Sequence, residues 1–319
     1  MPVISSSAGA KLILLGEHAV VYGQPALAIP FSGLKVRCVV EPWINAPTGT
    51  LHIKARELQL NQPLQALPED NFLRKAVELV LAELGVIQTP TCKLIIDSDI
   101  PISAGLGASA AIAVATMRAL SAFLGHLLDK ETLNRLALET EKLMHGNPSG
   151  IDNTVIVYEQ PILFRKGEPI EFVYPSKNLH FLIADSGIKK ATADTVAYLA
   201  QQRERNPQLI EAALAEIGNI ALFGKKAFEQ GDLSALGEAM NANQALLAQL
   251  DLSCKTLDQL IIAARQAGAL GAKLTGGGKG GNMLALVTPE TQEAVRKALL
   301  SAGAVNIYQT DLKGVQDHD

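Results

Sequence analysis

The sequence predicts an α+β protein built from two domains. Short apolar stretches rich in β-branched residues alternate with longer stretches whose apolar residues recur at helical spacing. The 319 residues are also enough for two domains that each bury a core. Around residues 168–178 the composition turns polar and includes two prolines. We therefore expect an N-terminal domain at residues 1–170 and a C-terminal domain at residues 171–319.

The N-terminal domain is expected to begin with strands and to continue with helices. Residues 51–60 alternate loosely between glycine and proline signals, which is typical of a hairpin. Residues 71–84 carry apolar side chains at helical spacing and end at Gly85, a common helix terminator. Further strands are predicted at 11–15, 34–40 and 92–96, further helices at 108–124 and 130–145, and a second hairpin at 155–158 and 162–164.

The C-terminal domain mixes the same two kinds of element. Strands are predicted at 181–184, 272–274, 283–287 and 306–311, and helices at 193–202, 208–230, 232–250, 255–267 and 290–302. The sequence contains no internal repeat and no run of coiled-coil heptads, which excludes a solenoid or a long coiled coil.

The composition narrows the class of function. Hydrophobic residues make up 48% of the chain and charged residues 19%, as in ordinary globular proteins. With a formal net charge of −4 and few aromatic residues, the chain shows no basic patch for nucleic acid. No apolar run reaches the roughly 18 residues of a membrane span, and the N-terminus lacks a signal-peptide pattern. Three isolated cysteines, Cys38, Cys92 and Cys254, are typical of reduced thiols, so a cytoplasmic protein is expected.

A glycine-rich loop at residues 101–111 is the most informative feature. It reads Pro-Ile-Ser-Ala-Gly-Leu-Gly-Ala-Ser-Ala-Ala and leads into the Ala-rich helix predicted from Ala108. Such a loop presents free backbone N–H groups and the positive end of a helix dipole, which together favour phosphate. The Gly-Lys-Ser/Thr of a Walker A loop is absent. A nucleoside triphosphate site is favoured over a purely structural turn, and over a dinucleotide site, whose preceding strand and acidic residue are not correctly spaced.

Several polar residues stand in apolar or glycine-rich surroundings. Lys11 lies in a strand of small and apolar residues, where it either faces solvent at an edge or points into a cleft to meet a phosphate or an alkoxide. Glu17 and His18 follow a glycine and either fix that turn or serve a site. Ser109, in the first turn of its helix, either caps the backbone or reaches a Mg²⁺ ion.

Two carboxylates flank a loop that contains two glycines and a proline. Glu141 belongs either to the solvated face of its helix or, with Asp152, to a pair that divides metal binding and activation of a nucleophile. Asp152 follows a loop whose conformational restriction indicates a role. His145 is interpreted as a hydrogen-bonded loop residue, because no partner residue lies at metal-site spacing.

A second glycine loop, at residues 276–281, has five glycines around Lys279. Alone, it is equally typical of a flexible turn. Together with the first glycine loop, it predicts two backbone cradles for one ligand.

Four segments occur in one order between residue 7 and about residue 285. They are Gly16-Glu-His-Ala-Val-Val-Tyr-Gly23, Pro101 to Ala111, His145-Gly-Asn-Pro-Ser-Gly-Ile-Asp152 and Lys273-Leu-Thr-Gly-Gly-Gly-Lys-Gly-Gly281. Together they resemble the superfamily of galactokinase, homoserine kinase, mevalonate kinase and phosphomevalonate kinase, and most closely its mevalonate kinase family. The first and third segments are specific to that family, whereas the glycine loops are shared more widely.

The resemblance implies an N-terminal domain like ribosomal protein S5 domain 2, a ferredoxin-like C-terminal domain, and ATP in the cleft between them. The implied reaction is ATP- and Mg²⁺-dependent phosphorylation of the 5-hydroxyl of mevalonate, a step in isoprenoid precursor synthesis. A homodimer is a further family expectation, and neither nucleic acid nor a membrane is an expected partner.

The resemblance also assigns roles to matching positions. It implies that Asp152 and Lys11 are catalytic and that Ser109 and Glu141 hold Mg²⁺. The implied substrate-binding residues are Glu17, His18, Lys190 and Thr192. The implied ATP-binding residues are Pro101, Ser103, Ala104, Gly105, Leu106, Gly107, Ala108, Ser109, Gly276, Gly277 and Gly278.

Three positions depart from the family pattern. Gly9 stands where a stiffening proline is usual, Ser103 stands where glycine is frequent, and Ala108 replaces the first of two serines. Because Ala108 removes a hydroxyl and leaves the backbone N–H groups, phosphate binding is still expected.

Two alternatives differ in the substrate or in the chemistry. A sister kinase or an ATP-dependent decarboxylase would act on a phosphorylated mevalonate, for which Lys189 and Lys190 are the candidate phosphate ligands. A non-catalytic sensor would bind a nucleotide or metabolite without turnover. The retention of Lys11, Ser109, Glu141 and Asp152 together argues against a sensor.

Overall fold

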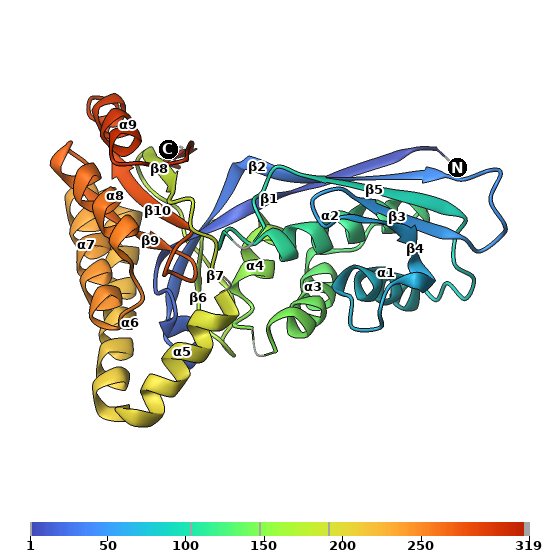
Figure 1. Cartoon of the computed structure of the whole chain (residues 1–319), viewed down its shortest axis with the longest axis horizontal. Coiled ribbons are helices and arrows are strands. Elements are labelled where there is room, and N and C mark those ends of the chain that lie inside the picture. The colour runs from blue at the N-terminus through green and yellow to red at the C-terminus, as the bar shows by residue number, and fades with distance from the viewer. Residues whose placement is uncertain (1, 103, 147, 191, 316–319) are drawn as a thin grey trace. The chain divides into compact units, whose positions relative to one another are not determined.

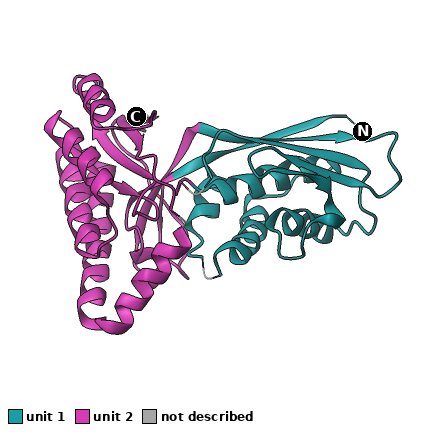
Figure 2. Ribbon diagram, viewed as in Figure 1, with its two compact units in different colours: residues 1–11, 34–102, 107–159 teal, residues 12–33, 103–106, 160–319 magenta. Residues whose placement is uncertain are grey.

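The computed structural model describes residues 2–102, 104–146, 148–190 and 192–315 (Figure 1). The chain forms two compact units (Figure 2). Unit 1 comprises residues 1–11, 34–102 and 107–159, and unit 2 comprises residues 12–33, 103–106 and 160–319. Residues 12–33 thus belong to the same compact unit as the C-terminal half of the chain. The predicted domain boundary after residue 170 stays a prediction.

The strands of unit 1 belong to a seven-stranded sheet in which β4, β3, β5 and β2 are neighbours in that order and β1 pairs with β2. Residues 12–15 of β1 and 26–33 of β2 group with unit 2. The strands are β1 (Ile4–Leu15), β2 (Ala26–Pro42), β3 (Leu51–Ala55), β4 (Leu60–Pro63) and β5 (Cys92–Ser98). The predicted hairpin at 51–60 is confirmed, because β3 and β4 pair antiparallel. β1 and β2 are longer than the predicted strands. β1 also includes residues 4–10, which alternate between more and less exposed positions, and β2 also includes residues 26–33, which are mostly buried.

Helices pack against one another in unit 1. They are α1 (Phe72–Glu83), α2 (Ala108–Phe123), α3 (Lys130–His145) and α4 (Ile151–Tyr158), with the short 3₁₀ helix η2 (Leu64–Ala66) after β4. Asn71 caps α1 by accepting from the N–H groups of Leu73 and Arg74, and Asp129 caps α3 by accepting from that of Thr132. The Ala-rich helix α2 is buried on nearly all sides, with α1, α3 and α4 as its neighbours.

The predicted hairpin at 155–158 and 162–164 is wrong. Residues 155–158 belong to α4, which starts after Gly150 in a left-handed conformation (φ 93°). The β-branched residues Val155 and Ile156 suggested a strand, but both are buried in the helical packing, which overrides their local preference. The predicted strand 162–164 exists as β6 (Ile162–Phe164), yet it pairs with β2 and with β7 (Glu171–Phe172).

Unit 2 contains a four-stranded antiparallel sheet in the order β11-β8-β10-β9. Its strands are β8 (Leu179–Asp185), β9 (Gly271–Thr275), β10 (Asn282–Val287) and β11 (Asn306–Leu312). Its helices are α5 (Thr192–Arg205), α6 (Pro207–Gln230), α7 (Leu233–Gln249), α8 (Lys255–Gln266) and α9 (Gln292–Ser301), with the 3₁₀ helix η1 (Ala19–Tyr22). Counted along the chain, the strand order is 4-1-3-2 with helical crossovers, which confirms the ferredoxin-like prediction.

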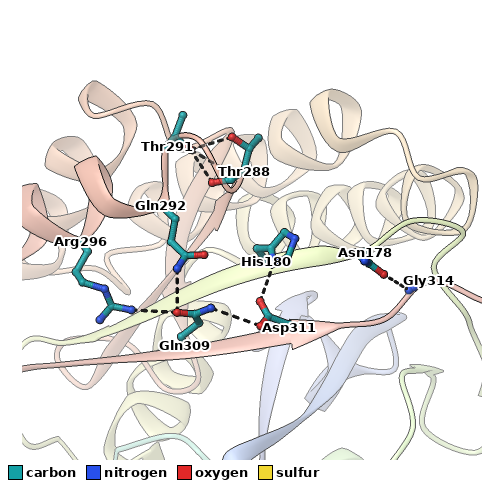
Figure 3. A network of polar contacts seen from close by, with 9 residues as sticks. All are labelled: Asn178, His180, Thr288, Thr291, Gln292, Arg296, Gln309, Asp311 and Gly314. Carbon is teal, nitrogen blue, oxygen red and sulfur yellow. Dashed lines mark hydrogen bonds and ion pairs between the residues drawn. The ribbon is translucent and has the colours of Figure 1, made fainter.

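The edge strand β11 is tied to its neighbours by side chains (Figure 3). His180 on β8 lies 2.7 Å from Asp311 on β11, measured from Nδ1 to Oδ1. Gln309 on β11 accepts hydrogen bonds from Gln292 and Arg296 of α9, at 2.9 and 3.2 Å. These contacts reach β11 from both β8 and α9, so the edge of the sheet is covered by polar groups rather than left open.

The described residues also bear on membrane insertion and on the state of the cysteines. The described helices include none with both the length and the hydropathy needed to cross a bilayer. The cysteines are free thiols, with Cys38 and Cys92 buried and Cys254 half-buried.

Candidate active site

Lys11 and Asp152 form an ion pair within unit 1. Lys11 Nζ lies 3.0 Å from Asp152 Oδ1. The Lys11 side chain is only 3% exposed, because it lies on a buried part of β1, whereas the Asp152 side chain remains 31% exposed in the first turn of α4. A buried ammonium requires a partner of this kind, and a carboxylate at a helix N-terminus is favoured by the helix dipole. Lys11 meets its partner although Gly9 precedes it where a proline was expected.

The N-terminus of α2 packs directly against Lys11. Gly107 occupies the N-cap position with φ 79°, and a Cβ atom there would lie 3.0 Å from both Lys11 Cγ and Ile156 Cδ1. Only glycine allows this approach without strain. Since Gly107 has no side chain to cap the helix, the first N–H groups of α2 remain available to an anion.

Ser109 and Glu141 form the second polar contact of this cluster. Ser109 Oγ donates to Glu141 Oε1 at 2.8 Å, and Glu141 is buried on α3. Burial, together with the negative charge of Asp152, raises the pKa of Glu141 to about 7, against the opposing effects of the Ser109 hydrogen bond and the Lys11 charge. His145, one turn further along α3, has its Nε2 3.5 Å from Glu141 Oε2, and burial lowers the pKa of His145.

The oxygen donors at this position fit a Mg²⁺ ion. Among the described residues, no group of three or more His, Cys, Asp or Glu side chains is arranged to hold a metal. Mg²⁺ in nucleotide sites commonly uses only one or two protein carboxylates and takes its other ligands from phosphate and water. A hydroxyl and a carboxylate in contact, with a second carboxylate nearby, are consistent with that donor set.

Glu17 and His18 are held inside unit 2. A Cβ atom on Gly16 would lie 2.6 Å from Ala26, and the Gly16 N–H donates to Asn243 Oδ1 at 3.0 Å. Glu17 forms an ion pair with Lys273 of β9, and both side chains are fully buried. A buried charge is stable only when it is paired, so this contact fixes the turn on β9.

His18 is a neutral imidazole at physiological pH. Its Nε2 lies 2.9 Å from the carbonyl oxygen of Gly277. Burial, together with the positive charge of Lys273, lowers the pKa of His18 to about 4, against the opposing effect of the hydrogen bond to Gly277. Because a carbonyl oxygen can only accept, Nε2 carries the proton and Nδ1 is left as an acceptor.

The two glycine loops touch inside unit 2. A Cβ atom on Gly276 would lie 2.8 Å from the Cα atom of Gly105, and Asn282 Nδ2 donates to the Ala104 carbonyl oxygen at 2.9 Å. A Cβ atom on Gly277 would lie 2.9 Å from Thr192 Oγ1. The backbones of the two loops that were predicted to bind one ligand therefore pack directly on each other, and Thr192 lies beside the second loop.

The other predicted site residues lie in different surroundings. Lys190 forms an exposed ion pair with Asp194 at 2.9 Å. Leu106 and Ala108 are buried, so only their backbone is available to a ligand, and Pro101 is half-buried. Ser103 lies outside the described residues.

Sequence reasoning missed two buried polar residues that support the site. Lys273 and Asn243 are both fully buried and hold the turn at residues 16–17. The sequence pattern could have indicated Lys273, since this lysine interrupts an otherwise apolar predicted strand. It could not have indicated Asn243, because an asparagine in an amphipathic helix is usually solvated.

Both halves of this chain are similar to known proteins. The GHMP kinases N terminal domain matches residues 71–160, and the GHMP kinases C terminal domain matches residues 225–305. The mevalonate kinase of Pyrococcus horikoshii is 37% identical over 95% of this chain and 93% of its own length. The chain belongs to the mevalonate kinase family of the GHMP kinases.

Solved structures agree with this membership. The mevalonate kinase of L. major in complex with R-mevalonate superimposes with a TM-score of 0.82 at 30% identity, covering 98% of this chain and 96% of that one. The Methanococcus jannaschii mevalonate kinase gives a TM-score of 0.82 at 25% identity, covering 99% and 98%. The two-domain GHMP kinase fold and the enzyme class predicted from the four segments are thereby confirmed.

Proposed function

We propose that this member of the mevalonate kinase family transfers the γ-phosphoryl group of ATP to the 5-hydroxyl of mevalonate, giving 5-phosphomevalonate. The observation that carries the proposal is the Lys11–Asp152 pair at 3.0 Å, in which a buried ammonium meets a carboxylate that is still accessible. The relatives named mevalonate kinase support the substrate, and one of them is solved with R-mevalonate.

The Lys11–Asp152 pair suits the activation of an alcohol. Asp152 accepts the hydroxyl proton or orients it, and its 31% exposure leaves room for the alcohol to approach. Lys11 stabilises the charge that develops on the acceptor oxygen and holds Asp152 in place. Phosphoryl transfer asks a protein mainly for positioning and electrostatic stabilisation, which two fixed charges can provide.

The phosphates of ATP are assigned to backbone groups. The uncapped first turn of α2 after Gly107 offers N–H donors and a positive dipole. The glycines at 105 and 276–278 leave the backbone of both loops free of side chains, which lets a phosphate approach closely.

Ser109 and Glu141 are the residues that would hold Mg²⁺. The ion supplies charge neutralisation on the phosphates of the bound nucleotide. Glu141 is suited to a cation because burial and Asp152 both disfavour its free carboxylate, as its raised pKa indicates. Ser109 keeps the carboxylate oriented through its hydrogen bond.

His18, Thr192 and Lys190 are proposed to bind mevalonate. Glu17 is fully buried against Lys273, so we propose that it serves the substrate site by holding the turn that carries His18. His18 presents a neutral acceptor atom, so it would accept a hydrogen bond from a hydroxyl rather than pair with a carboxylate. Thr192, beside Gly277, offers a hydroxyl. Lys190, already paired with Asp194, has a cationic group that could turn to the substrate carboxylate.

A substrate panel tests the proposal. Purified protein, ATP and Mg²⁺ are combined with mevalonate, 5-phosphomevalonate, homoserine or galactose, and ADP release is followed in a coupled assay. We expect turnover with mevalonate alone. Turnover only with 5-phosphomevalonate would indicate the sister kinase or decarboxylase, and ATP binding without ADP release on any alcohol would indicate a sensor. A homodimer is also proposed from the family, and light scattering of the same preparation tests it.

A further inference from the structure

The second glycine loop contains a charged residue that the proposed reaction does not use. Lys279 stands among the five glycines of residues 276–281. Its Nζ atom lies 2.9 Å from Asp251 Oδ2 and 3.7 Å from the centre of the Tyr198 ring. The Tyr198 hydroxyl donates to the same Asp251 oxygen at 2.7 Å. We call these three residues, Lys279, Asp251 and Tyr198, the latch.

The latch joins three parts of unit 2. Lys279 belongs to the glycine loop, Asp251 to the turn after α7, and Tyr198 to α5. A cation over an aromatic face and a shared carboxylate reinforce each other, because the carboxylate holds both the ammonium and the hydroxyl of the same ring. The hydrogen bonds from Lys279 and Tyr198 lower the pKa of Asp251, so the latch is in its ionised form at neutral pH.

The backbone beneath the latch is held in an unusual shape. Lys279 and Asp251 both have left-handed conformations, with φ of 53° and 54°, although neither is glycine. The Lys279 N–H donates to the Leu252 carbonyl oxygen at 2.8 Å, and a Cβ atom on Gly278 would lie 2.1 Å from that oxygen. Two non-glycine residues at positive φ in one contact cost free energy, and such conformations persist where the surroundings hold them.

The latch also reaches the residues proposed to bind ligands. α5 contacts the loop at two places, through Thr192 beside Gly277 and through Tyr198 over Lys279. On its other side the loop packs on the first glycine loop, where Gly276 meets Gly105. A loop rich in glycine is flexible unless it is tethered, so the latch restricts the part of the loop between these contacts.

We propose that Lys279, Asp251 and Tyr198 are positioning residues that hold the second glycine loop in the conformation that binds the polyphosphate of a nucleoside triphosphate. The proposal rests on the proposed function only in taking this loop as part of the nucleotide site. A pre-organised loop loses less conformational entropy on binding, so the latch increases nucleotide affinity without touching the reacting atoms.

Three conservative variants test the latch. Asp251→Asn removes the charge and keeps a residue that tolerates left-handed backbone, Tyr198→Phe removes only the hydroxyl, and Lys279→Met removes only the ammonium. The dissociation constant of ATP is measured by calorimetry, and KM and kcat by the coupled assay. We expect each variant to raise both Kd and KM for ATP by about three- to tenfold and to leave kcat within about twofold.

Two further variants separate the latch from simpler explanations. Lys279→Arg can still cover the ring and pair with Asp251, so it should restore the affinity for ATP. Tyr198→Phe combined with Asp251→Asn should weaken binding by less than the two single variants together, because both substitutions act on the contact between Tyr198 and Asp251. Lys297→Met is the matched control: it removes an ammonium from an exposed pair with Glu293 on α9 and should leave the Kd unchanged.

The outcome for Asp251→Asn decides between two roles of Lys279. If Lys279 binds phosphate directly, Asp251 competes with the nucleotide and its removal tightens ATP binding, which would overturn the proposal. An unchanged Kd in all three variants would also overturn it, since the contacts would then be ordinary surface pairs. If the wild-type protein binds ATP but does not phosphorylate mevalonate, the proposed function fails while the Kd comparison still tests the latch.

Discussion

At the scale of single residues, the proposed mechanism depends on an ion pair that is only partly buried. Lys11 is almost completely buried and Asp152 is partly exposed, so the pair has one side fixed by packing and another open to a ligand. This asymmetry distinguishes it from the fully buried Glu17–Lys273 pair, which has no exposed side. The two pairs contain similar groups, and their difference in exposure is consistent with the catalytic role proposed for the first and with a supporting role for the second.

Replacement of Asp152 by asparagine tests the proposed proton acceptor. The substitution keeps the size of the side chain and removes its basicity, so kcat should fall by at least about a hundredfold while the Kd for ATP changes little. Steady-state kinetics and calorimetry measure the two effects. Glu168→Gln, which removes an exposed carboxylate paired with Arg165, is the control. Near-normal turnover of Asp152→Asn would remove this residue from the mechanism.

Glu141→Gln tests the proposed metal ligand. An amide is a weaker Mg²⁺ ligand than a carboxylate, so the Mg²⁺ concentration for half-maximal activity should rise by about tenfold or more. The matched control is Glu139→Gln on the same helix, where Glu139 is paired with Lys142 at the surface. A titration with Mg²⁺ at saturating ATP measures the effect, and identical curves for the two variants would rule out Glu141 as a ligand.

The buried His18 predicts a dependence of stability on pH. Its pKa falls from 6.5 to about 4 on folding, so the unfolded chain binds a proton more readily than the folded chain. The associated stability is complete above pH 6.5 and is lost as the pH falls towards 4, with a total of about 3 kcal/mol. Urea unfolding at pH 7.5 and pH 4.5 should show a smaller loss in His18→Gln than in the wild type. Equal losses would indicate that His18 titrates normally.

At the scale of elements, most helices and strands were predictable, whereas the β-branched segment at 155–158 was not. The predicted helix at 108–124 and the observed α2 differ by one residue, because glycines precede it and alanines fill it. Val155 and Ile156 lie in a helix for a tertiary reason, since their side chains fill buried space beside α2 and α3. Periodicity in so short a segment cannot separate the two structures.

Gly107→Ala tests the packing of α2 on Lys11. The new methyl group would lie 3.0 Å from Lys11 Cγ at a left-handed φ of 79°, so the variant should lose stability and displace the ammonium. Gly125→Ala is the control, because Gly125 is also left-handed (φ 86°) and has nothing within 4 Å of the added methyl group. Both should lose about 1 kcal/mol of unfolding free energy through the left-handed backbone, and Gly107→Ala should lose more because its methyl group crowds Lys11 and Ile156. Only Gly107→Ala should lower kcat, by about tenfold or more. Equal kcat values would show that the contact with Lys11 is unimportant.

At the scale of the whole molecule, contacts between distant segments complete each unit. Glu17 and Lys273 are 256 positions apart, and their ion pair fastens the turn at residues 16–18 to β9 in unit 2. In unit 1, β1 supplies Lys11 while α4 supplies Asp152. The order of the four motif segments along the chain predicted the family, but no local pattern showed which side chains would pair.

Lys273→Met tests the contribution of the long-range pair to folding. The variant leaves Glu17 buried without its cation and should cost about 3–5 kcal/mol of unfolding free energy. The double variant Glu17→Leu/Lys273→Met removes both charges and should be more stable than Lys273→Met alone. Urea unfolding measures both, and additive losses would show that the two side chains do not interact.

Local sequence was sufficient for most helices and strands, the two glycine loops and the family, because periodicity, helix-terminating glycines and motif spacing act over a few residues. It left open whether Lys11 faces solvent or a cleft, whether Glu17 fixes its turn or serves a site, and whether Ser109 caps its helix or reaches a metal ion. Only the three-dimensional packing gives the contacts of these residues, which are Asp152, Lys273 and Glu141, all far along the chain. A charge is buried only where an opposite charge or a hydrogen-bonding group meets it, and long-range folding decides where that happens.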